Sequence, residues 1–193
     1  MPSPFGIPMC SYELDERLSI RALGPGWNET AIENDAADLV SPAPIGRPLL
    51  MFLTDATTVM LHEALFQRVL TARRTLTFPI RCDAPHLRRY LNVSVAPKPA
   101  GGFIVSTLLI RSESRPPVAL LAPGTPRRDD LVKVCSWCKR VSAHGRWVEV
   151  EEAISLLQLF ERREQPQLSH GICEPCHRFM QTMLADDSEL PSR

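Results

Sequence analysis

Two Cys-x-x-Cys pairs constrain this chain more than any other feature of its sequence. The first pair is Cys135 and Cys138, the second is Cys173 and Cys176, and residues 139–172 separate them. Two residues between thiolates allow one tight turn to present both sulfurs to the same ion, and two such turns complete a tetrahedral site. The spacing therefore predicts a metal site that stabilises a small C-terminal module.

The identity of the metal stays open at this stage. Zn²⁺ is the first expectation, because a small module with a thin core gains stability from a structural ion. An iron–sulfur cluster uses the same four thiolates, and a metal-free thiol set that responds to redox state is a third interpretation. His170 and His177 lie close to the second pair, but with four cysteines present we expect neither to be a ligand.

Composition and the N-terminal sequence favour a soluble, cytoplasmic protein. The segment MPSPFGIPMC lacks the basic and long apolar parts of a signal peptide, and no uninterrupted apolar run is long enough to span a bilayer. In that compartment paired cysteines bind metals more often than they form structural disulfides. Because 22 Lys and Arg balance 22 Asp and Glu, bulk charge gives no support for a nucleic-acid partner.

Hydrophobic periodicity predicts an α+β domain over residues 10–112. Residues 11–23 are typical of two short strands, and residues 27–40 are compatible with helix. Asp55 is a candidate N-cap for a helix over about residues 55–73. The period then changes from 3.6 to 2, and three strands follow that begin near Leu76, Leu87 and Phe103. This order predicts an antiparallel sheet with flanking helices.

Two further parts follow the predicted domain. Residues 113–129 contain four prolines and are typical of a semi-rigid linker. Residues 130–185 form the predicted four-cysteine, metal-binding module. Within it we expect a strand over residues 147–150 and a helix from Glu151 to about Arg163 with Phe160 facing inward, ended by Pro166.

Several segments of residues 10–112 resemble a PAS sensory domain. They are Ser11-Tyr12-Glu13-Leu14-Asp15, Trp27-Asn28, Glu33-Asn34, Gly46-Arg47-Pro48 and Phe78-Pro79-Ile80-Arg81-Cys82-Asp83. The C-terminal part, from Cys135-Ser-Trp-Cys-Lys-Arg through Leu168-Ser-His-Gly-Ile-Cys173-Glu-Pro-Cys176, resembles a cysteine module that follows PAS domains in bacterial signalling proteins.

The resemblance carries expectations for fold and function. It implies a PAS-like five-stranded antiparallel sheet with helices over one face, enclosing a pocket for a small-molecule ligand, and it implies a homodimer. The function it predicts is that of a sensory or adaptor protein in signal transduction. Such a protein perceives a small ligand, a redox state or a partner, and passes the signal to another protein.

No enzyme signature is present, so we expect a non-enzymatic protein. The sequence lacks a phosphate-binding Gly-rich loop, a G-x-S-x-G turn and an H-E-x-x-H motif. Two alternative functions are a thiol-based redox switch or iron–sulfur sensor and, less favoured, a zinc-ribbon nucleic-acid binder. The basic residues for the latter are interspersed with Glu149, Glu151 and Glu152, and they are Arg127, Arg128, Lys133, Lys139, Arg140 and Arg146.

Four other features of the sequence are candidates for function. His62 lies mid-helix, where some haem-binding PAS domains place an axial ligand, although a surface histidine is the simpler interpretation. Cys82 shares the apolar parity of its strand and is expected to be a buried, inert thiol. Trp27 is expected to anchor the core or an interface. A charged cluster at one hairpin either clamps an anion or forms a solvated rim of salt bridges, and its members are Arg81, Asp83, Arg88 and Arg89.

Overall fold

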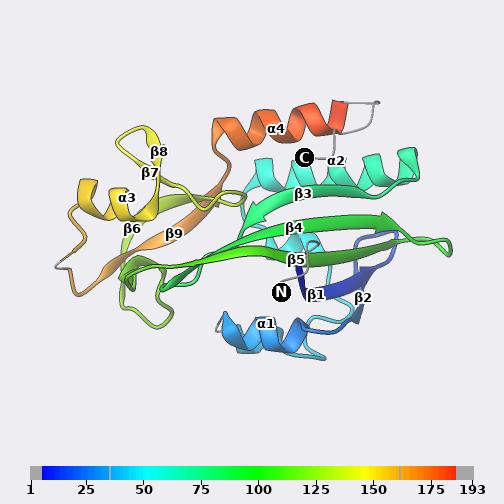
Figure 1. Ribbon diagram of the computed structural model, residues 1–193, viewed down its shortest axis with the longest axis horizontal. Helices are drawn as coiled ribbons and strands as arrows, with labels where there is room; N and C mark the ends of the chain where they lie inside the picture. The colour runs from blue at the N-terminus through cyan, green and yellow to red at the C-terminus, as the bar shows by residue number, and fades with distance from the viewer. Residues whose placement is uncertain (1–5, 35, 161, 186–193) are drawn as a thin grey trace.

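Two β-sheets, connected along the chain by residues 115–126, form the framework of the fold (Figure 1). The computed structural model describes residues 6–34, 36–160 and 162–185. Residues 35 and 161 each fall inside a segment predicted to be helical and lie outside the described residues.

The first sheet has five antiparallel strands in the order β2-β1-β5-β4-β3. Its strands are β1 (Ile7–Leu14), β2 (Ile20–Leu23), β3 (Leu76–Arg81), β4 (Leu87–Pro97) and β5 (Phe103–Ser114). Each of the three strands predicted after the long helix begins at the expected residue. The expected five-stranded antiparallel sheet is confirmed.

Helices flank this sheet, and the buried side chains of the longest of them fill much of the first core. They are α1 (Trp27–Glu33), the 3-10 helices η1 (Ala37–Leu39) and η2 (Leu49–Phe52), and α2 (Ala56–Ala72). Asp55 caps α2 as predicted, because its carboxylate accepts a hydrogen bond from the backbone N–H of Thr58 at 2.8 Å. Phe66 of α2 packs edge-on against Phe103 of β5 at a centroid distance of 4.8 Å.

The second sheet has four strands in the order β8-β7-β6-β9. They are β6 (Arg127–Cys135), β7 (Val141–Ala143), β8 (Arg146–Val148) and β9 (Gln165–Gly171), with α3 (Val150–Leu156) between β8 and β9. β6 and β9 pair in parallel, whereas the β6–β7 and β7–β8 pairs are antiparallel. The buried side chains of α3 pack with valines of these strands in a second core.

The chain returns to the first core through α4 (Glu174–Ala185), which lies beside α2 (Figure 1). Met180 and Met183 of α4 are buried and belong to the first core, as do Cys135, Trp137 and Cys173. The four-cysteine segment therefore packs against the first sheet and its helices as well as forming its own sheet.

Residues 113–129 are packed against both sheets and contain regular structure. β5 continues to Ser114, η3 spans Ala119–Leu121, and β6 begins at Arg127. Val118 and Leu120 are 4% and 0% exposed and belong to the second core. Apolar burial thus holds much of this proline-rich segment in place.

Three details predicted for the C-terminal segment are wrong. The helix that starts near Glu151 ends at Leu156 rather than near Arg163, and Phe160 is 75% exposed while Leu159 is buried. Pro166 does not end a helix, because it lies within β9. Among the described residues, no helix has both the length and the apolar character required to cross a membrane.

Candidate metal centre

The parallel pairing of β6 and β9 places the two Cys-x-x-Cys pairs side by side. Cys135 is the last residue of β6 and lies opposite Gly171, the last residue of β9. Because parallel strands end at the same edge of a sheet, the turn after β6 and the turn after β9 emerge together. Cys173 lies two residues after the end of β9, and Cys176 lies in the first turn of α4.

Backbone hydrogen bonds fix the shape of the first turn. The N–H of Cys135 donates to the carbonyl of Arg140 at 2.8 Å, and the N–H of Lys139 donates to the carbonyl of Cys135 at 3.0 Å. Lys139 adopts a left-handed conformation with φ of 58°. The N–H of Ser136 donates to the carbonyl of Gly171 at 2.8 Å, so the first turn is tied directly to the end of β9.

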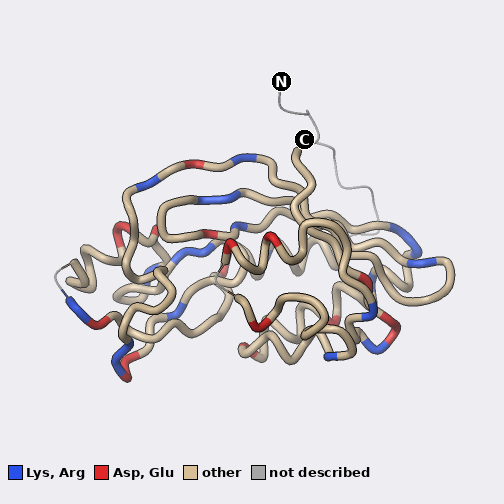
Figure 2. Tube along the Cα trace, turned by 90° about the horizontal axis from the view of Figure 1, so that it is seen from below, with Lys and Arg blue, Asp and Glu red and all other residues tan. Residues whose placement is uncertain are grey.

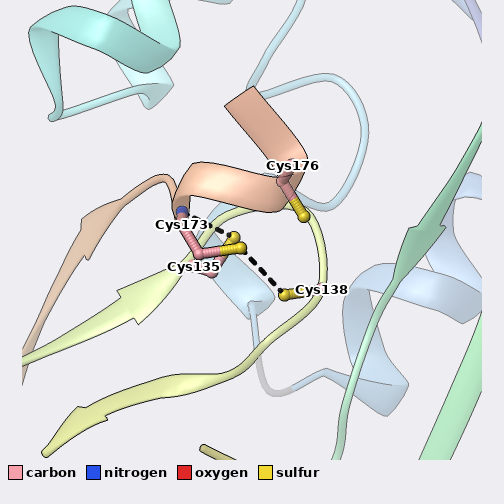
Figure 3. A group of neighbouring side chains, drawn as sticks. All are labelled: Cys135, Cys138, Cys173 and Cys176. Atoms are coloured by element: carbon pink, nitrogen blue, oxygen red, sulfur yellow. Dashed lines mark hydrogen bonds between the residues drawn. The ribbon is translucent and has the colours of Figure 1, made fainter. Parts of the chain in front are cut away.

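The four sulfurs converge on one small volume, as Figure 3 shows. The Sγ atoms of Cys135, Cys138, Cys173 and Cys176 all lie within 4.8 Å of one another, and all four residues are free thiols. The Sγ atoms of Cys138 and Cys173 are 3.6 Å apart. A tetrahedral zinc site with Zn–S bonds of about 2.3 Å separates its sulfurs by about 3.8 Å, so these spacings fit a single ion.

The thiols perturb one another strongly. Side-chain hydrogen bonds with Cys138 and Cys176 lower the pKa of Cys135 far below its usual range. The hydrogen bond with Cys135 raises the pKa of Cys138 to about 12, and hydrogen bonds with Cys135 and Cys138 raise that of Cys176. Hydrogen bonds among the thiols therefore favour loss of the proton from Cys135 and its retention on Cys138 and Cys176. A bound cation deprotonates the thiols that it coordinates.

Partial positive charges also surround the sulfurs. The backbone N–H of Cys173 donates to the Sγ of Cys135 at 3.4 Å. Cys173 and Cys176 lie at the N-terminal end of α4, where the helix dipole favours thiolates. The pKa of Arg140 is raised first by its hydrogen bond to Glu149 and further by the charges of Cys138 and Cys173.

The structure distinguishes the four cysteines from the two nearby histidines as potential metal ligands. Within the described ranges, the cluster of potential metal ligands contains the four cysteines and neither His170 nor His177. His177 has its backbone N–H bonded to the carbonyl of Cys173 inside the first turn of α4. The four-cysteine arrangement can therefore hold a metal ion with sulfur ligands alone.

A cavity of about 400 Å³ lies between the metal centre and the first sheet. Its floor is apolar and includes Phe78, Ile80, Val93 and Val105 of the sheet. The turn between the first two cysteines supplies part of its wall through Ser136 and Trp137. The polar side chains of the lining are Tyr12, Thr54, Asp55, Thr58, His62, Thr107, Ser136, Lys139 and His170. No local sequence pattern predicts this wall, because residues near position 137 meet the sheet only through tertiary packing.

His62 lies in the wall of this cavity. Its Nδ1 is 2.8 Å from the carbonyl oxygen of Thr58, and its ring packs against Trp137 at a centroid distance of 5.1 Å. Burial lowers the pKa of His62, although the hydrogen bond to Thr58 opposes the shift, so the ring is neutral near pH 7. The surface position expected from sequence is wrong, and the haem hypothesis stays a prediction.

The charged cluster predicted at the hairpin is neither an open clamp nor a solvated rim. Asp83 has a side chain only 2% exposed and accepts from Arg81 at 2.6 Å and from Arg115 at 3.2 Å. Arg81 also bonds Glu149 at 2.7 Å, and Glu151 pairs with both Arg115 and Arg88. These ion pairs join the hairpin of the first sheet to the N-terminal end of α3. Arg81, Asp83 and Arg115 are buried, whereas Glu149 and Glu151 are more than a third exposed.

The remaining candidates occupy structural positions. Arg89 belongs to a separate group, in which it donates to Asn34 and to the carbonyl of Cys82. Cys82 is half-buried, with its Sγ 3.6 Å from Arg89. Trp27 packs edge-on against Tyr12 and donates to the carbonyl of Leu39 at 2.7 Å, so it anchors η1 to the sheet.

Basic residues of the C-terminal part are interspersed with acidic ones. Figure 2 shows both basic and acidic positions at many separate places along the trace. Arg128, Arg140 and Arg146 each pair with a nearby carboxylate. Pairing of this kind lowers the local positive potential on which nucleic-acid binding depends.

The chain matches no protein-family model, and a search of curated proteins finds no match.

Proposed function

We propose that the four cysteines bind one structural zinc ion that holds the C-terminal part of the chain against the first sheet. The observation that carries this proposal is the convergence of four sulfurs within 4.8 Å from two separate turns. Sulfurs this close suit a single ion better than a multi-iron cluster, in which the cysteines bind different iron atoms. With four protein ligands the site has no open position for a substrate, which is typical of structural zinc.

Around this centre we propose a non-enzymatic sensory or adaptor protein of signal transduction. The PAS resemblance of residues 10–112 suggests this role. The five-stranded antiparallel sheet, the helices over one face and the cavity of about 400 Å³ beneath them support it. Self-association as a homodimer is part of the proposal, and the exposed hydrophobic side chains of Ile104 and Ile110 on β5 support it. A protein partner then receives the signal.

Elemental analysis and an absorption spectrum of the purified protein test the metal assignment. We expect about one equivalent of zinc and no absorption in the visible region. Visible bands from iron bound by sulfur would contradict zinc, and a Soret band would revive the haem hypothesis for His62. Size-exclusion chromatography with light scattering tests the homodimer on the same sample.

A redox switch at the same site is the second candidate function. Cys138 and Cys176 are only partly buried, so an oxidant can reach them while Cys135 and Cys173 are shielded. Treatment with dilute peroxide, followed by a colorimetric zinc assay, separates the two candidates. Rapid zinc release that a thiol reductant reverses favours the switch, and a site inert to peroxide favours the structural ion.

A further inference from the structure

The imidazole of His62 keeps one unused hydrogen-bond acceptor in the cavity between the metal centre and the first sheet. Its Nδ1 lies 2.8 Å from the backbone carbonyl oxygen of Thr58. Because a carbonyl only accepts, Nδ1 carries the proton of this hydrogen bond. Burial lowers the pKa of His62 and so favours the neutral ring, in which Nε2 keeps a free lone pair.

The Nε2 atom of His62 is open to a bound molecule. It has no hydrogen-bond partner among the described residues, and it is not fully enclosed by protein. The two nitrogens of an imidazole point in nearly opposite directions, so Nε2 is directed away from the backbone of α2. Since the side chain lines the cavity, this acceptor faces it. The indole nitrogen of Trp137, which packs against His62, is by contrast wholly enclosed.

The hydroxyl of Tyr12 is a second unused polar group in the same cavity. Within the described ranges it has no hydrogen-bond partner, and it too is not fully enclosed. Burial raises the pKa of Tyr12, so the hydroxyl keeps its proton and can donate. Neighbouring hydroxyls are already engaged. Thr58 donates to Asp55 at 2.9 Å, and Thr107 donates to the carbonyl of Cys10 at 3.1 Å.

The rest of the lining suits an uncharged molecule with an apolar body. The sheet supplies an apolar floor of Phe78, Ile80, Val93 and Val105. The volume of about 400 Å³ lies within the range of roughly 300–1,000 Å³ that is typical of small-molecule sites. The charged side chains at the cavity already have partners, since Asp55 caps α2 and the Nζ of Lys139 donates to the carbonyl of Ser136 at 3.0 Å. His170 lines the cavity from an exposed position.

We propose that this cavity binds a small, neutral, predominantly apolar molecule with a hydroxyl group, which donates to Nε2 of His62, while the hydroxyl of Tyr12 donates to an oxygen of the same molecule. The inference deepens the proposed sensory function and rests on it, since it names the chemical class of the ligand. The ring of His62 packs against Trp137 at a centroid distance of 5.1 Å. The bound hydroxyl is therefore separated by one side chain from the turn between the first two cysteines.

A pair of matched probes tests the proposed hydrogen bond. 2-Naphthol and 2-methylnaphthalene share a ring system and are both uncharged near neutral pH, but only the former has a hydroxyl. Equilibrium dialysis against the full-length protein measures both dissociation constants. Their ratio is compared between proteins, so the different solubilities of the probes cancel. Absence of saturable binding of both probes to the unaltered protein would overturn the proposal.

His62→Phe keeps an aromatic ring and removes the acceptor. We expect the preference for 2-naphthol to be about fivefold lower in this variant, which is the effect of one neutral hydrogen bond. His62→Gln offers an amide oxygen in place of Nε2 and should restore the preference. His86→Phe makes the same change at an exposed histidine that does not line the cavity, and it should leave the preference unchanged. An unchanged preference in His62→Phe, or an equal fall in His86→Phe, would overturn the assignment.

Tyr12→Phe removes only a hydroxyl and tests the second contact. This variant should also lower the preference for 2-naphthol, because the oxygen of the probe then has no donor. An unchanged preference would overturn the role of Tyr12.

A spectroscopic measurement on the unaltered protein covers the case in which the variants fail to fold. Long-range ¹H–¹⁵N spectra report the ring nitrogens of the five histidines, and a ring protonated at Nδ1 has its own pattern of cross-peaks. 2-Naphthol should move the unprotonated nitrogen of such a ring upfield, and 2-methylnaphthalene should not. Absence of this shift at saturating 2-naphthol would overturn the hydrogen bond to His62.

Zinc content, measured on each sample, separates this inference from the proposed metal centre. Zinc without probe binding defeats only the ligand inference, whereas probe binding without zinc defeats only the metal centre.

Discussion

The two sheets of this protein are stabilised by different kinds of contact. The first core contains aromatic and long aliphatic side chains, including Phe66, Phe78 and Phe103. The second core, within the described residues, is built from valines, alanines, leucines and one isoleucine. Since buried apolar area sets most of the stabilisation, the second sheet gains less from packing and depends more on the cysteine centre and on buried ion pairs.

The largest expected effect comes from removal of one metal ligand. Cys173→Ser should abolish stoichiometric zinc binding and lower the free energy of unfolding by several kcal/mol, because structural zinc contributes on the order of 10 kcal/mol in small domains. Elemental analysis and thermal unfolding measure both quantities. Cys10→Ser is the matched control, since Cys10 lies outside the cluster and contacts Thr107. Retained zinc and unchanged stability in Cys173→Ser would refute the claim that the second sheet depends on a metal ion at the cysteines.

The next largest effect tests the buried ion pairs of Asp83, which lie where the first sheet meets the N-terminal end of α3. Asp83→Asn leaves Arg81 and Arg115 without their shared carboxylate, and removal of one partner from a buried pair costs about 3–5 kcal/mol. Glu152→Gln makes the same chemical change in an exposed pair and should cost less than about 1 kcal/mol. Chemical denaturation of both variants gives the comparison. Equal losses would show that the junction is solvated.

A substitution that shortens one side chain in the proline-rich segment tests whether this segment is a linker or part of the second core. Leu120→Ala should cost about 2–5 kcal/mol, because the side chain is 0% exposed. Leu131→Ala is the matched control at 65% exposure and should change stability by less than about 0.5 kcal/mol. Indistinguishable unfolding midpoints for the two variants would show that residues 113–129 are a linker and not part of the second core.

The smallest effect comes from loss of the N-cap of α2, the long helix that packs on the first sheet. Asp55→Ala removes the N-cap of α2 and should cost about 1 kcal/mol. Asp55→Asn keeps an oxygen that can accept from Thr58, so its loss should be clearly smaller. Thermal unfolding resolves the difference, and equal losses for both variants would argue against the cap.

The first sheet was largely predictable because its signals are local. Strand periodicity, the cap at Asp55 and the change of period after α2 each depend on neighbouring residues. Three of its four strand pairings also join strands that lie close in sequence or follow through a short turn. The convergence of the four cysteines was predicted as well, because the Cys-x-x-Cys spacing itself specifies a shared site.

The second sheet was only partly predictable, and β6, β7, β9 and α4 were missed. β9 has the sequence QPQLSHG, which lacks apolar alternation, and its backbone pairs with the distant β6. A parallel pair of this kind depends on long-range contacts that no local pattern encodes. The burial of Arg81 and Trp137 was hidden for the same reason, since each is covered by a segment far away in sequence.

The parallel alignment of β6 and β9 also has a consequence for the order of folding. During synthesis Cys135 and Cys138 leave the ribosome well before Cys173 and Cys176 exist, so the early chain offers only two thiolates. The strands of the first sheet are complete by then, and their mostly local pairings form fast. We therefore expect ion capture to be a late event that coincides with docking of β9. An ion bound at full strength would mark a chain whose C-terminal part has been completely made.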